Sequence, residues 1–86
     1  FNSNLQTSRQ TGEIARMRKA LEGDDQIVEL RTNIRCTAES QRGNGVIDTA
    51  TLLQRISDEA VARNTRSIHE IELLKTIYEL KHTVNQ

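Results

Sequence analysis

Few side chains in this sequence could take part in catalysis or metal binding, and their spacing argues against both. His69 and His82 stand more than three helical turns apart, which is not the short spacing of paired metal ligands. Ser67 lies two positions before His69, and residues two apart on a helix point to different sides, so they cannot work as nucleophile and base. Glu70 and Glu72 diverge for the same reason. We expect these histidines and glutamates to be solvated surface residues.

The other reactive residue types are isolated. Asp24 and Asp25 stand too far from other ligand types to form a metal site. Cys36, the single cysteine, cannot form an internal disulfide, and we expect it to be a small, buried or half-buried helix residue. A reactive thiol would need an electropositive pocket, which the sequence does not indicate. The sequence therefore predicts neither an enzyme nor a site for a metal or another cofactor.

Composition narrows the remaining classes. The chain has 86 residues, enough for one small domain, with 12 basic and 12 acidic side chains that cancel. The basic residues are interleaved with acids, as in the pair Glu59 and Arg63, and two aromatic residues provide no platform for stacking bases. We therefore expect no nucleic-acid binding. No apolar run is long enough for a membrane-spanning helix.

The elements that carry these residues are organised around the centre of the chain. Two of the four glycines, Gly43 and Gly45, fall within three residues there, and Asp48 or Thr49 can cap a following helix. About 40 residues without proline flank this turn on each side. The sequence predicts an all-α fold, a single antiparallel helical hairpin over residues 1–86, with helices at about 7–41 and 49–84 joined by a glycine-rich tip at 42–48.

Apolar residues recur with a helical period in both arms. In the first arm Gly23 leaves two alternatives open, one continuous helix or a break at this point. The apolar row of that arm comprises Ile14, Met17, Leu21, Ile27, Leu30, Ile34 and Ala38. The second arm has one row with the spacing of a coiled-coil seam, namely Leu53, Ile56, Ala60, Asn64, Ser67, Ile71, Leu74 and Tyr78. Its second row comprises Val61, Ile68, Leu73, Ile77, Leu80 and Val84.

Two apolar rows on one helix have a consequence for assembly. A helix in a lone hairpin needs only one apolar face, so the second row predicts further neighbours, as in a helical barrel or a bundle of hairpins. We expect residues whose numbers add up to about 90, such as Ile34 and Ile56, to lie at similar heights along the rod. The centre of the first row, with Ala60, Asn64 and Ser67, suits either a weak coiled coil or a close helix approach.

Residues from about 27 to 84 resemble the C-terminal coiled-coil region of the TolC-type outer-membrane efflux and secretion channels. The matching motifs are the turn Arg42-Gly43-Asn44-Gly45-Val46-Ile47-Asp48 and the run Thr51-Leu52-Leu53-Gln54-Arg55 that follows it. It extends through Ala60-Val61-Ala62-Arg63-Asn64 to Ile77-Tyr78-Glu79-Leu80-Lys81. The first residue is not methionine and no signal peptide is visible, so we expect this chain to be a piece of a larger channel protein.

The resemblance implies an architecture and partners. Channels of this family are trimers whose long hairpins pack side by side into a periplasmic α-barrel. The glycine-centred turn would be the periplasmic tip, which opens for export and contacts a periplasmic adaptor (membrane fusion) protein. The resemblance therefore places the chain in the periplasmic portion of a bacterial outer-membrane protein, with membrane contact only through other parts of that protein. The partner-binding residues would be Arg42, Gly43, Asn44, Gly45, Val46, Ile47 and Asp48.

The chain also departs from the family pattern. The family often has aspartates at the pore-entrance positions that match Thr51 and Gln54, so a cation-binding ring at that level is not expected here. Arg42 replaces a tyrosine before the glycine, and we expect it to pair with an acid of a neighbouring hairpin. Asp48 keeps one carboxylate at the tip, where an N-cap is the simpler role. The alternative to a channel segment is a self-standing coiled-coil module for oligomerisation or adaptor functions.

Overall fold

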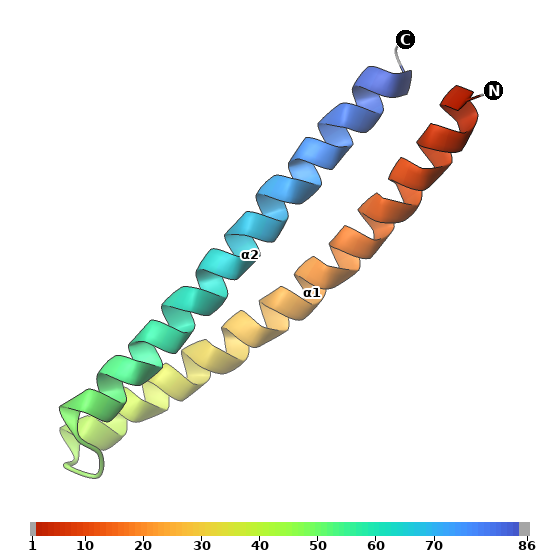
Figure 1. Ribbon diagram of the computed structural model, residues 1–86. Coiled ribbons are helices and arrows are strands. Elements are labelled where there is room, and N and C mark those ends of the chain that lie inside the picture. Colours follow the sequence, from red (N-terminus) through yellow and green to blue (C-terminus); the bar gives the residue numbers. More distant parts are fainter. Residues whose placement is uncertain (1, 85–86) are drawn as a thin grey trace.

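The chain folds into one long helical hairpin. The structure, a computed structural model, describes residues 2–84, and it consists of α1 (Asn2–Gly43) and α2 (Thr49–Val84). The two helices run antiparallel along their full length, with a tight turn at one end (Figure 1). The rod measures 66 × 15 × 13 Å. This confirms the predicted all-α hairpin.

The helix boundaries differ from the predicted ones mainly at the beginning. α1 starts at Asn2 instead of about residue 7, because no proline or glycine interrupts the segment before Thr7. Phe1 lies outside the described residues. α1 also continues through Gly23 without a break, which decides between the two alternatives that the sequence left open. The second helix has the predicted bounds.

The turn ends α1 with a Schellman motif. The Val46 N–H donates to the Gln41 carbonyl at 2.7 Å, and the Gly45 N–H donates to the Arg42 carbonyl at 3.0 Å. Gly45 has a φ of 75°, the left-handed conformation that this motif requires and that favours glycine. Gly43 is the last helical residue, so Gly45 is the glycine that turns the chain.

The glycines provide a first prediction. A Cβ added at Gly23 or Gly45 would meet no atom within 4 Å, so the two positions differ in backbone conformation and not in space. Gly23→Ala should stabilise the chain by about 0.5–1 kcal/mol, because alanine favours a helix interior. Gly45→Ala should destabilise it by about 1 kcal/mol, because of its positive φ. Thermal unfolding followed by circular dichroism measures both, and a loss of stability in Gly23→Ala would contradict the helical assignment there.

A strict heptad row on each helix forms the seam between them. On α1 the residues that are buried or half-buried at this seam are Thr7, Gln10, Ile14, Met17, Leu21, Asp24, Val28, Arg31, Arg35 and Ala38. On α2 they are Leu52, Arg55, Glu59, Ala62, Arg66, His69, Leu73, Thr76, Leu80 and Thr83. Both rows alternate steps of three and four residues, which is the spacing of a coiled-coil seam. The buried apolar core is small: Ile14, Ala38 and Leu73.

The orientation of α2 differs from the sequence-based prediction. The row from Leu53 to Tyr78 was expected to face α1, but Leu53, Ile71, Leu74 and Tyr78 are 58–75% exposed. From the second row, Leu73 is buried and Leu80 is half-buried, so they face α1. We name the exposed side the outer face of α2. It comprises Leu53, Ser57, Ala60, Val61, Asn64, Ser67, Ile68, Ile71, Leu74 and Tyr78.

The register of the two helices agrees with the prediction. Asp25 contacts Arg66, with residue numbers that add up to 91, and Thr32 contacts Arg63, with numbers that add up to 95. Residues at equal height therefore have numbers that add up to slightly more than 90. This rule places Leu21 at the height of Leu73.

Candidate functional site

The tip is the first candidate site, and the sequence located it correctly in the fold. Of the seven predicted partner-binding residues, Arg42, Gly43, Asn44, Gly45, Val46 and Asp48 are exposed, and Ile47 is half-buried. They lie together at the end of the rod that is opposite Asn2 and Val84 (Figure 1). The geometry therefore gathers these residues into one exposed surface.

Asp48 caps α2. Its carboxylate Oδ1 accepts a hydrogen bond from the Thr51 N–H at 2.8 Å, which satisfies one of the free donors at the helix N-terminus. This backbone hydrogen bond lowers the pKa of Asp48 below its usual value. Arg42 donates from Nε to the Thr49 hydroxyl at 3.1 Å, so the last turn of α1 is linked to the first turn of α2. The tip is thus a tied turn with defined geometry.

The two apolar tip residues differ in exposure. Val46 is 68% exposed and extends into solvent at the end of the rod. Ile47 is half-buried and lines a shallow depression between the helices together with Ala38 and Thr51. Val46 therefore provides the exposed apolar contact of the tip, whereas Ile47 folds back over the end of the seam.

The two predicted pore-entrance positions lie on the first turns of α2. Thr51 is half-buried beside Ile47, and its N–H serves the Asp48 cap. Gln54 is exposed, and its side-chain amide donates to Asp58 Oδ1 at 2.9 Å. Neither side chain is charged, and Asp58, the carboxylate that Gln54 contacts, also lies 3.6 Å from Arg55.

The centre of the seam is the second candidate site, and it is ionic. Arg35 of α1 donates from Nε and Nη2 to both carboxylate oxygens of Glu59 on α2, at 3.0 and 3.2 Å. Such a two-pronged pair is strong and fixes the relative position of its partners. Arg63 also contacts Glu59, at 3.3 Å. The hydrogen bonds from Arg35 are the main cause that lowers the pKa of Glu59 to about 2.

A second ionic group lies closer to the chain ends. His69 Nδ1 is 2.5 Å from Asp24 Oδ2, and the side chain of Asp24 is only 11% exposed. This hydrogen bond raises the pKa of His69. Next to it, Arg66 pairs with Asp25 across the seam and with Glu70 along α2. The expectation that His69 is a solvated surface residue is therefore wrong, because it is half-buried and paired across the seam, whereas Glu70 is exposed as expected.

The register contained the signal for these pairs. Asp24 and His69 have numbers that add up to 93, and Arg35 and Glu59 have numbers that add up to 94. Applying the height rule to the charged residues, as well as to the apolar ones, would have found both pairs. Cys36 is also placed differently from the prediction: it is exposed, because it lies outside the seam row.

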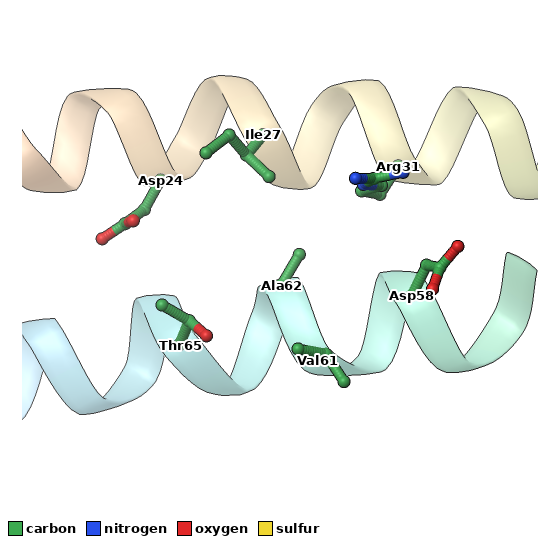
Figure 2. Close-up of a pocket in the computed structure, with 7 residues that line it drawn as sticks. All are labelled: Asp24, Ile27, Arg31, Asp58, Val61, Ala62 and Thr65. Carbon is green, nitrogen blue, oxygen red and sulfur yellow. The ribbon is translucent and has the colours of Figure 1, made fainter.

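The two broad sides of the rod have different character. On one side, a shallow groove between the helices is lined by Ile27 of α1 and by Val61, Ala62 and Thr65 of α2, with charged residues toward its ends (Figure 2). Ile27 is 49% exposed and Val61 is 62% exposed. Arg63 donates to the Thr32 hydroxyl of α1, and Glu70 pairs with Arg66 along α2. The grooved side is open and partly apolar, and it merges with the outer face of α2.

Within residues 2–84, no three ligand-type side chains gather as a metal would require. In the same part of the chain, neither helix has the length and apolarity to cross a membrane. Comparison of the chain with protein-family models, with curated proteins and with solved structures found no match. The exposed surfaces of the hairpin are therefore the features that indicate its function.

Proposed function

We propose that this chain is a periplasmic α-barrel hairpin of a TolC-type outer-membrane export channel, whose tip docks a periplasmic adaptor protein. The observation that supports this most directly is that α2 has apolar residues on two opposite sides. One side of α2 packs against α1, and the outer face carries exposed leucine, isoleucine, valine and tyrosine side chains. In a barrel of side-by-side hairpins, a neighbouring helix would cover that face.

The inner seam supports the proposal in a second way. A hairpin held together by Arg35–Glu59 and Asp24–His69 does not need its most apolar row for internal packing. That row is left for contacts between hairpins, where burial is favourable at about 25 cal/mol per Å² of apolar surface. In the proposed assembly, three chains of the full-length protein contribute such hairpins to one barrel.

The tip supports the docking part of the proposal. Gly43 and Gly45 leave backbone groups uncovered by side chains, and Val46 provides an exposed apolar contact. The Schellman motif and the Asp48 cap hold this surface in one conformation, so docking costs little ordering entropy. An α-helical hairpin of the adaptor, meeting the rod end to end, fits such a surface.

The test of this function uses the full-length protein. Val46→Ser with Ile47→Ser removes the apolar tip contacts but keeps the Schellman glycine and the cap. Export by the cell should fall by at least tenfold, while the amount of protein and its trimeric state stay unchanged. Glu29→Gln, a mild change at an exposed position of α1 outside the tip and the outer face of α2, is the control and should export normally. Normal export by the double variant would show that the tip is only a turn.

The rival function is a self-standing coiled-coil module. It is supported by the fact that the hairpin completes its own turn, cap and seam within the described residues. The coding sequence upstream of residue 1 distinguishes the two functions. A signal sequence, strand-forming segments and a second hairpin support the channel, whereas a start codon directly before Phe1 supports the module.

A further inference from the structure

The outer face of α2 is an uncharged surface of considerable length. From Leu53 to Leu74 none of its residues is charged, and all of them are exposed. Five aliphatic side chains and Tyr78, each 47–75% exposed, leave on the order of 100 Å² uncovered for each aliphatic residue and more for tyrosine. With its small residues, the face can provide the roughly 800 Å² per partner that a stable interface buries.

The order of residues along this face is nearly symmetric about Asn64. Leu53 and Leu74 stand near its two ends with the small residues Ala60 and Ser67 between them, and Val61 and Ile68 flank Asn64. Ser57 and Ile71, which correspond to each other, depart from the symmetry. A surface with this order matches a second copy of itself after a two-fold rotation. The rotation brings Leu53 beside Leu74 of the second copy, Ala60 beside Ser67, and Val61 beside Ile68. Ala60 and Ser67 are small, so the apolar contact near the axis comes from Val61 and Ile68.

We propose that the outer face of α2 binds a second copy of this chain, with the rods antiparallel and the two-fold axis at Asn64. The two Asn64 side chains then meet at the axis, where amides can hydrogen-bond to each other and fix the register. This inference does not depend on the proposed function, because it concerns the chain by itself. In a channel, the same face would be covered by a neighbouring hairpin instead.

The charges on α2 favour an antiparallel dimer over a parallel one, in which both tips would lie at the same end. With aligned tips, Lys75 would lie beside Lys75 of the second copy, and Lys81 beside Lys81. The antiparallel orientation separates these like charges by the length of the face, and it also opposes the two helix dipoles favourably. Arg63 lies near the proposed axis, but its guanidinium is directed to Glu59 and Thr32 within its own hairpin.

Sedimentation and cross-linking of the 86-residue chain test the proposal. The wild-type chain should sediment with twice the mass of the 9.8 kDa monomer at about 100 µM. Ile71→Lys on the outer face should weaken association at least tenfold. Leu30→Lys is the matched control, because Leu30 is an equally exposed aliphatic residue on α1, at 55%, and that variant should stay dimeric.

Cross-linking then tests the axis. In a Cys36→Ser background, Asn64→Cys should form a disulfide dimer on mild oxidation, because a two-fold axis places the residue beside its copy. Leu53→Cys alone should not, since its copy lies about 30 Å away in the antiparallel arrangement. A monomeric wild-type chain, or efficient cross-linking through Leu53→Cys, would overturn the proposal.

Discussion

Replacing Leu73 by alanine should be among the most destabilising single changes in this chain, with a loss of about 2–3 kcal/mol. Leu73 is 8% exposed and belongs to the small apolar core of the hairpin, at the height of Leu21. Truncation removes buried methyl groups and leaves a cavity in a seam that has few other apolar contacts. Urea unfolding of the chain, at a concentration low enough for the monomer, measures this loss.

The adjacent residue provides a matched control. Leu74 is also a leucine on α2, but it is 58% exposed on the outer face. Leu74→Ala should change the stability of the monomer by less than about 0.5 kcal/mol, as is usual for surface substitutions. A larger loss of stability in Leu74→Ala than in Leu73→Ala would contradict this packing. It would mean that α2 is rotated so that the row from Leu53 to Tyr78 faces α1.

The topology of the hairpin was predictable from the sequence because the strongest signals are local. Glycine at the turn, Asp48 as a cap and the absence of proline act on the neighbouring backbone alone. The tip residues could therefore be located in the fold before any packing was known. The start of α1 was less predictable, because Thr7 and Ser8 can cap a helix or continue inside one.

The face of α2 that packs against α1 was not predictable from the period of α2 alone. The more apolar row of α2 is the one on its outer face. A prediction based on apolarity alone would therefore place that row against α1. The seam row of α1, however, contains Asp24 and Arg35, which need partners of opposite charge at the same height. His69 and Glu59 supply them. The face that α2 turns toward α1 therefore depends on charge complementarity between the two helices. The apolar period of one helix gives no information about this complementarity.

These seam pairs make the stability of the hairpin depend on pH in both directions. The pKa of Glu59 is lowered from 4.5 to about 2, mainly by the hydrogen bonds from Arg35. Its contribution is present above the unfolded pKa of 4.5 and is lost as the pH falls toward 2. The pKa of His69 is raised above 6.5, mainly by the hydrogen bond to Asp24. Its contribution is complete below pH 6.5 and is lost as the pH rises through the raised pKa.

The melting temperature should therefore be highest between about pH 4.5 and 6.5 and fall on both sides. Glu59→Gln should flatten the acidic side of this profile, and His69→Gln should flatten the alkaline side. Asp24→Asn should flatten the alkaline side less than His69→Gln does, because Glu72, which also raises the pKa of His69, remains in place. Calorimetry across this pH range measures all three variants. An alkaline side that keeps its slope in His69→Gln would show that the Asp24–His69 pair does not stabilise the hairpin.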